Sequence, residues 1–212
     1  GDTITAVDIR THPPSYTGVV AATQRFTSRW LALPHVPTRP AVIAAYMRLS
    51  SGTICTEIDR SESERLLRAQ PFIASATIQA IRESAGHVRL QVDVVDELRL
   101  IGGATTRRGS ISSLLLGTEN FSGRGVSFVA NARRGFEYRD GFGVHAIKYG
   151  MFGRPDFLAV RAERRPVIGE RLSLELAEPF LTDLQRRAFH LSTSLLSGYT
   201  ALLRPTGDAV SL

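Results

Sequence analysis

The sequence predicts a small α+β module followed by an antiparallel all-β segment, and three observations carry this prediction. Two apolar helical segments lie between one strand and a pair of strands within residues 1–97. The last of these strands, residues 88–95, alternates strictly between apolar and polar residues, which is typical of a sheet with one buried face. From residue 98 onward, alternating segments of about ten residues are separated by Gly-, Asn- or Pro-containing turns, and no helical period recurs.

Composition limits the classes of protein to which this chain can belong. With 212 residues and 43% hydrophobic content, the chain can bury a core, and we do not expect it to be disordered. The net charge of +6 comes almost entirely from arginine, since Lys148 is the only lysine. Such a charge suits an anion- or nucleic-acid-binding module. The arginines are scattered singly or in pairs, however, which favours solvated surfaces, so we expect no nucleic-acid partner.

The sequence contains no apolar run of about 18 residues, which excludes a transmembrane helix. It does not exclude a transmembrane β-barrel, because barrel strands alternate and are not hydrophobic on average. No charged and then apolar leader begins the sequence, so we expect that any secretion signal has been removed or left out.

Nothing in the sequence predicts catalysis, a cofactor or a metal site. Cys55 has no second cysteine as a partner, and we expect it to serve as a small apolar residue. Gly123 and Gly125 lack the third glycine and the following helix of a phosphate-binding loop, and no Gly-x-Ser-x-Gly elbow occurs. The histidines are isolated, without metal-ligand spacing: His12, His35, His87, His145 and His190. We therefore expect that the protein is not an enzyme.

The first predicted element is a half-buried strand at residues 3–11, in which Ile4 and Val7 fall on opposite faces. The stretch His12-Pro13-Pro14 ends it, because proline supplies no ladder donor. Further on, Phe26 and Trp30 are four residues apart, which favours a helix within residues 15–37, with an irregular loop as the alternative.

Two helices are predicted next. The first runs from Ala41 to Leu49, with Thr38 as its N-cap and Pro40 in its first turn. Its apolar stripe, suited to lying on a sheet, consists of Val42, Ile43, Tyr46, Met47 and Leu49.

The second helix runs from Asp59 to Gln70, and Asp59 with Glu62 resembles a capping box. Its core candidates are Ile58, Leu66 and Leu67. Its charged residues, Glu62, Glu64, Arg65 and Arg68, are interpreted as a solvated face.

Two strands complete the module, at residues 75–82 and 88–95, joined by a hairpin at residues 83–86. The side chains expected to face inward are Val88, Leu90, Val92 and Val94. The series Thr38-Arg39, apolar helix, Gly52 turn, Glu62-x-Glu64-Arg65-x-Leu67-Arg68, Phe72-Ile73 and Val-x-Leu-x-Val-x-Val resembles a POTRA domain. POTRA domains are periplasmic modules of the BamA/TamA outer-membrane assembly superfamily. The order β-α-α-β-β over residues 1–97 is the POTRA arrangement.

Residues 98–212 have the pattern of antiparallel barrel strands, with apolar side chains toward lipid and polar ones toward a wet lumen. In the clearest segment, Leu172, Leu174 and Leu176 lie opposite Ser173 and Glu175. A water-soluble β-sandwich alternates in the same way. The segments named as strands are 125–132, 142–149, 157–165, 171–177 and 188–195.

Three motifs in this half also resemble the superfamily, in its order and at roughly its spacing. They are Glu119-Asn120-Phe121-Ser122-Gly123-Arg124-Gly125, Tyr149-x-x-Phe152-Gly153-Arg154 and Glu178-Pro179-Phe180. The resemblance implies that residues 98–212 are the N-terminal strands of a surface-antigen-type outer-membrane β-barrel. About half a dozen strands cannot close a barrel, and an open edge in lipid is costly. Either further strands lie outside these residues, or the segment is not a membrane barrel.

The resemblance further implies an outer-membrane protein whose N-terminal domain lies in the periplasm. Its POTRA domain would bind extended polypeptide, and its barrel would insert or translocate it. The implied partners are unfolded outer-membrane or secreted polypeptides, outer-membrane lipid and accessory assembly proteins. The alternative is a secreted or periplasmic β-rich binding protein without a membrane barrel.

The candidate binding site is the edge of the strand at residues 75–82, because the strand at 88–95 is expected to be central. An edge strand offers main-chain hydrogen bonds to an added strand, with little sequence preference. No proline blocks this edge, and the alternative is that it is solvated or covered by residues 15–37. The residues of the candidate edge are Ser75, Ala76, Thr77, Ile78, Gln79, Ala80, Ile81 and Arg82.

Overall fold

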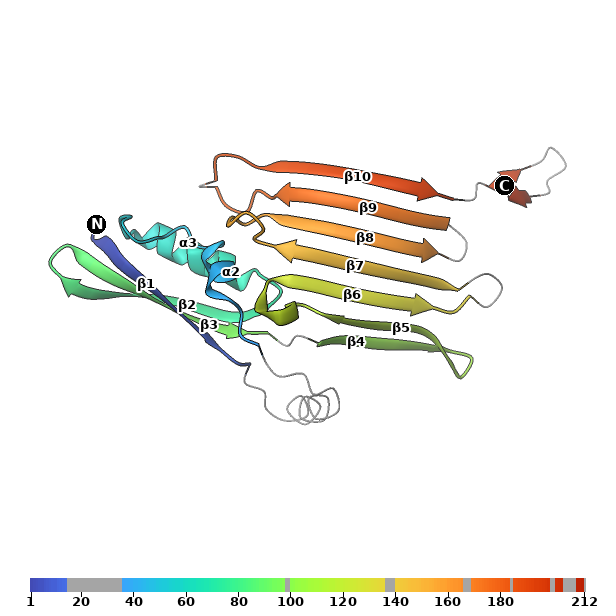
Figure 1. Cartoon of the computed structure of the whole chain (residues 1–212), viewed down its shortest axis with the longest axis horizontal. Coiled ribbons are helices and arrows are strands. Elements are labelled where there is room, and N and C mark those ends of the chain that lie inside the picture. Colours follow the sequence, from blue (N-terminus) through green and yellow to red (C-terminus); the bar gives the residue numbers. More distant parts are fainter. Residues whose placement is uncertain are drawn as a thin grey trace.

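The computed structural model describes residues 1–14, 36–97, 100–135, 140–165, 169–183, 185–198, 201–203 and 209–211. The helix expected within residues 15–37 therefore falls almost entirely outside the described residues. The described chain forms a three-stranded and a seven-stranded sheet, with a further two-stranded pair, β11 (Ala201–Leu203) and β12 (Ala209–Ser211), near the C-terminus (Figure 1).

The N-terminal module has the element order strand, helix, helix, strand, strand, as the sequence predicts. Its elements are β1 (Thr3–His12), α2 (Pro40–Ala44), α3 (Glu57–Arg68), β2 (Ile73–Ser84) and β3 (His87–Asp96). The sheet order is β1-β3-β2, with β1 parallel and β2 antiparallel to β3. The central position of β3 is therefore confirmed, and β2 is an edge strand.

The core of this module lies where the helices pack against the sheet. Val88, Leu90, Val92 and Val94 of β3 are at most 5% exposed, which confirms the inward face predicted from their alternation. They share one cluster with Val42 and Ile43 of α2, Leu66 and Leu67 of α3, and Phe72 in the turn before β2. Burial of these side chains is the main stabilising contribution to the module.

Strand β1 differs from its prediction because it contains a bulge. The pairing passes from Ile4 opposite Val88 to Ala6 opposite Arg89, so Thr5 is an extra residue. This shift by one residue brings Val7, opposite Leu90, to the same face as Ile4. The prediction that Ile4 and Val7 lie on opposite faces is therefore wrong.

The first helix is shorter than predicted, since α2 ends at Ala44 and a turn follows. Tyr46 and Leu49 are nevertheless buried. Thr38 is not the N-cap, which is Arg39 without a side-chain cap. The Thr38 hydroxyl instead donates to Asp96 Oδ1 at 2.6 Å.

The second helix begins earlier than predicted. Thr56 is its N-cap: its Oγ1 accepts a hydrogen bond from the Asp59 amide at 3.1 Å and donates one to Asp59 Oδ2. Asp59 is thus the third residue of the helix, bonded to the N-cap side chain, and not the N-cap itself. Ile58 is 66% exposed, because it lies about 180° around the helix from buried Leu67. Its assignment to the core is wrong.

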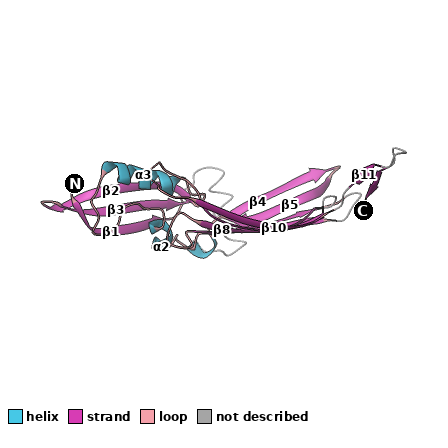
Figure 2. Cartoon of the chain, turned by 90° about the horizontal axis from the view of Figure 1, so that it is seen from above, coloured by secondary structure: helices cyan, strands magenta, loops and turns pink. Residues whose placement is uncertain are grey.

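The second sheet is an antiparallel meander that leaves the module along the long axis of the molecule (Figures 1 and 2). A short 3-10 turn, Phe121–Gly123, follows its second strand. Its strands are β4 (Leu100–Arg107), β5 (Ser110–Thr118), β6 (Val126–Arg133), β7 (Gly141–Tyr149), β8 (Phe157–Arg165), β9 (Gly169–Glu178) and β10 (Phe189–Ser197). Their order is β10-β9-β8-β7-β6-β5-β4, so within the described residues the sheet is open and forms no closed barrel.

The pairing register divides this sheet into two chemically different faces, since directly paired residues share a face. One face carries an apolar belt of Leu114, Leu116, Phe128, Ala130, Phe142, Val144, Leu158, Val160, Leu172, Leu174, Leu176, Leu191 and Leu195. The opposite face is mixed: it includes Leu115, Val129 and Ile147, and its polar members are Asn131, His145, Arg161, Glu163, Arg171, Ser173, Glu175 and Ser192. The predicted alternation of Leu172, Leu174 and Leu176 against Ser173 and Glu175 is confirmed.

No helix in the described part of the chain is long and apolar enough to cross a membrane.

Candidate functional site

The candidate edge, β2, pairs along one side with β3. Ala76 and Ile78 are buried, whereas Thr77, Gln79 and the residues after them are exposed. Ala80, two residues beyond Ile78, is exposed as well. The structure therefore places all eight predicted residues on one edge strand.

The first half of this edge is covered by arginines from α3. Arg60 Nη1 donates to the Ile78 carbonyl at 2.7 Å, and Arg68 Nε donates to the Ala76 carbonyl at 2.9 Å. Alternate residues of an edge strand point their backbone groups toward the neighbouring strand or away from it. The backbone groups of Ala76 and Ile78 therefore point away from β3, and by the same alternation those of Ala80 do too. We call residues of this kind the outward set.

Both arginines share one carboxylate, that of Glu64. Arg60 Nη1 lies 3.2 Å from Glu64 Oε2, and Arg68 Nη2 binds Glu64 Oε1. The Glu64 side chain is only 14% exposed, and that of Glu62 is 17% exposed. The interpretation of this charged set as a solvated face is therefore wrong for its two carboxylates, because they anchor arginines that bridge to other elements.

The second half of the edge, Ala80 to Ser84, is open. In the part of the chain that the structure describes, no group outside β3 binds the backbone of these residues. The nearby charged side chains pair with other residues of the module: Arg82 with Asp2, just before β1, at 3.4 Å, and Glu83 with Arg89 of β3 at 2.6 Å.

The opposite edge of the same sheet is covered along the start of β1. The Ile4 amide donates to the Thr53 carbonyl at 2.9 Å, and the Gly52 amide donates to the Ile4 carbonyl at 2.8 Å. The Cys55 amide likewise donates to the Asp2 carbonyl at 2.8 Å. Cys55 is half-buried, and this burial raises the pKa of its thiol.

A buried polar junction joins the module to the seven-stranded sheet. Thr38, Asp96 and Asn120 are at most 2% exposed. Asp96 accepts from the Thr38 amide and hydroxyl, and Asn120 Nδ2 donates to the same hydroxyl at 2.6 Å. Asn120 Oδ1 then accepts from the Gly125 amide at 2.7 Å, so every member of the chain of contacts is hydrogen-bonded.

The glycines of the motif Glu119–Gly125 are explained by this junction. The Arg39 amide donates to the Gly123 carbonyl at 2.9 Å. Gly123 has φ +67°, and a Cβ there would lie 2.1 Å from the Pro37 carbonyl oxygen. A Cβ at Gly125 would lie 2.9 Å from Val42. Only glycine permits these approaches without a shift of the backbone.

Aromatic and charged contacts extend the junction. The rings of Phe72 and Tyr149 are 5.6 Å apart between centroids. Arg65 Nη2 donates to the Leu181 carbonyl at 2.5 Å and also to Glu62 Oε1 at 2.7 Å. Hydrogen bonds from Arg65 and then Thr182 lower the pKa of Glu62 to about 2. Sequence reasoning missed this junction, although Asn120 lies within a motif that it singled out.

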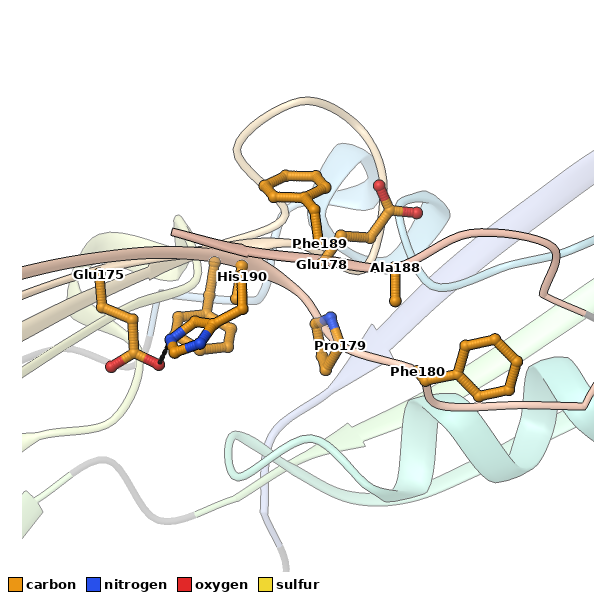
Figure 3. A pocket seen from close by; sticks show the side chains of 9 residues that line it. Glu175, Glu178, Pro179, Phe180, Ala188, Phe189 and His190 are labelled. Carbon is orange, nitrogen blue, oxygen red and sulfur yellow. Dashed lines mark hydrogen bonds and ion pairs between the residues drawn. The ribbon is translucent and has the colours of Figure 1, made fainter. Parts of the chain in front are cut away.

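A shallow depression of about 500 Å³ lies at the turn between β9 and β10 (Figure 3). Its lining is largely apolar, and His190 Nε2 lies 3.1 Å from Glu175 Oε1 beside it. It is lined by Phe157, Glu175, Ala177, Glu178, Pro179, Phe180, Ala188, Phe189 and His190. Within the described residues, no cluster of His, Cys, Asp and Glu could hold a metal ion.

Comparison with known proteins gives a structural resemblance alone. No family model matches the sequence, and no curated protein matches it. Among solved structures, the chain is similar to BamA from Haemophilus ducreyi lacking POTRA domains 1–3, with a TM-score of 0.56 and 12% identity. The match covers 91% of this chain and 35% of that one, so the chain spans about a third of the length of that structure. At this identity the likeness concerns the fold.

Proposed function

We propose that the chain is part of an outer-membrane protein of the BamA type, in which the seven-stranded sheet faces lipid with its apolar belt. The belt carries this proposal. Its members include Leu116 at 58% exposure, Phe142 at 56% and Leu195 at 71%. Exposed apolar surfaces of this extent mark sites of protein or membrane interaction. The similarity to BamA supports the membrane as the partner.

The polar face of the sheet supports the same assignment. Arg161, Glu163 and Glu175 lie opposite the belt, as expected for side chains that line a wet lumen. The open edges of the sheet, β4 and β10, need partner strands in lipid, because unpaired backbone groups there are costly.

The N-terminal module would then lie in the periplasm as a POTRA-type domain and receive extended polypeptide at the β2 edge. Unfolded outer-membrane or secreted polypeptides are the proposed cargo, with accessory assembly proteins as further partners and no catalytic step. Backbone pairing at an edge suits such cargo, because it depends little on sequence. The open residues Ala80 to Ser84 support this role.

Membrane insertion is tested by fluorescence quenching in the full-length protein. A probe attached to cysteine at Leu172, Ser173, Leu174, Glu175 or Leu176, one at a time in a Cys55→Ser background, should alternate in accessibility to a lipid-soluble quencher. Quenching should be strong at the three leucine positions and weak at the other two. Uniform quenching along the five positions would contradict the membrane assignment.

Strand addition is tested by removing an outward donor. The alternation places the Gln79 amide toward β3, so Ala80→Pro is the change that removes an outward N–H. This variant should stay folded yet lose most crosslinking to an unfolded outer-membrane polypeptide. Ala85→Pro, in the turn beyond β2, is the matched control. Undiminished crosslinking of a folded Ala80→Pro variant would show that strand addition does not occur there.

A further inference from the structure

The α3 arginines that bind the β2 carbonyls have a consequence for cargo binding. We propose that Arg60 and Arg68 form a latch that closes the first half of the β2 edge to an incoming polypeptide strand. This inference rests on the proposed strand addition at β2. It assigns the place where pairing begins and the residues that limit its extension.

In the latch, each arginine binds both a β2 carbonyl and the carboxylate of Glu64. Arg60 binds the Ile78 carbonyl and Glu64, and Arg68 binds the Ala76 carbonyl and Glu64. Arg60 is held further by Glu57, with Nε and Oε2 2.9 Å apart. A guanidinium suits this arrangement because its planar set of donors reaches two acceptors at once, whereas an ammonium is a compact point charge.

An added strand needs the outward carbonyls as acceptors for its own amides. The outward set on β2 comprises Ala76, Ile78, Ala80 and Arg82. The first two carbonyls already accept a guanidinium N–H, and the backbone of the last two is open within the described residues. Pairing therefore begins at Ala80 and Arg82 and extends toward Ala76 only after the arginines leave.

Release of the latch does not require the ion pairs to break. Glu64 lies midway between Arg60 and Arg68 on α3, one turn from each. Both guanidiniums can swing from the β2 carbonyls while they stay paired with this carboxylate. The closed and released arrangements thus keep the same charges neutralised, so a modest gain from strand pairing suffices to open the latch.

The test compares crosslinking at two positions on the same exposed face of β2. Thr77→Cys reports the closed half and Ile81→Cys the open half, each in full-length protein with Cys55→Ser. The probe is an unfolded outer-membrane β-barrel polypeptide carrying one cysteine. In the parent, disulfides should form mainly at position 81. Arg60→Ala with Arg68→Ala should raise the yield at position 77 several-fold and change that at 81 little.

Two further variants separate the latch from charge and folding effects. Arg60→Lys with Arg68→Lys keeps both charges, removes the planar donors and should also raise the yield at position 77. Arg65→Ala removes a positive charge from the same helix without touching β2, and should leave the ratio of the two yields unchanged. Melting temperatures confirm that each variant is folded.

The outcomes distinguish the latch from strand addition itself. Equal yields at positions 77 and 81 in the parent, or a ratio that neither double variant changes, would overturn the latch and leave strand addition standing. Absence of crosslinks at both positions in every variant would overturn strand addition at β2, and the latch with it.

Discussion

The two sheets of this molecule share the same alternating sequence pattern but differ in whether described elements cover their apolar faces. In the N-terminal module, the inward face of β3 is covered by helices, and Leu90, Val92 and Val94 have no exposed surface. In the seven-stranded sheet, the apolar face is uncovered. Among the described residues, the buried hydrophobic side chains of this sheet, Ala159 and Ala177, lie on the opposite face.

The difference shows that an alternating sequence identifies a strand with one apolar and one polar face. It does not show what covers the apolar face. In the module, the cover is built into the chain as α2 and α3. In the larger sheet no described element lies over the belt, and lipid is the cover that we propose. The following predictions test this contrast from the largest expected effect to the smallest.

The largest effect is expected in the module core. Val92→Asp places an unpaired charge among the buried side chains and should cost about 3–5 kcal/mol or more, enough to unfold the module. Thermal melting followed by limited proteolysis of the full-length protein measures this. Thr77→Lys, which places a charge at an exposed position of the neighbouring strand opposite Asp93, should melt like the parent. A Val92→Asp protein with parental melting would refute the core.

A charge in the belt should act differently. Leu174→Arg should cost about 2–4 kcal/mol in the bilayer while leaving the melting of the module unchanged. The fraction that resists urea extraction from membranes is the measure. Ser173→Arg, on the opposite face, should be retained like the parent. Equal losses for both variants would mean that the two faces have the same surroundings.

The junction between the two regions should be intermediate. Asn120→Ala leaves the buried Gly125 amide without its acceptor and removes the donor to Thr38, at a cost of about 1–3 kcal/mol. The midpoint of urea unfolding should fall accordingly. Phe121→Ala, at a neighbouring residue with 62% exposure, is the control and should change it little.

The smallest effect concerns pH. The pKa of Glu62 is lowered from 4.5 to about 2, so its carboxylate stabilises the folded state above pH 4.5. This contribution is lost as the pH falls toward 2. It should be about 1 kcal/mol, since its partner Arg65 is about half exposed and water screens the pair. Urea unfolding at pH 7 and pH 3 should show a smaller difference for Glu62→Gln than for the parent.

Local patterns predicted the fold well where each strand has two distinct faces. The strand predicted at residues 157–165 coincides with β8 (Phe157–Arg165), and the alternation of β3 identified its buried side chains. Strands β4 and β5 were not named individually. Gly102 and Gly103 in one, and Ser112 and Ser113 in the other, interrupt the apolar alternation.

Features that depend on distant residues could not be predicted in this way. The bulge at Thr5 reverses the face of Val7, yet no period in β1 reveals it. The edge position of β2 followed from the order of the elements. Its cover by Arg60 and Arg68 did not, because a charged helical residue has the same sequence pattern whether it is solvated or reaches a neighbouring strand.

The junction has a mechanical consequence. Asp96 ends β3 and Asn120 follows β5, and both bind Thr38, while Arg65 binds the Leu181 carbonyl, so the described residues tie the two sheets at two points. A sheet fixed in a bilayer would therefore fix the height and tilt of the module above it. On the proposed function, the β2 edge would bind polypeptide at a set distance from the membrane surface. That distance would decide which part of a long polypeptide meets the edge, whatever the local sequence of the polypeptide.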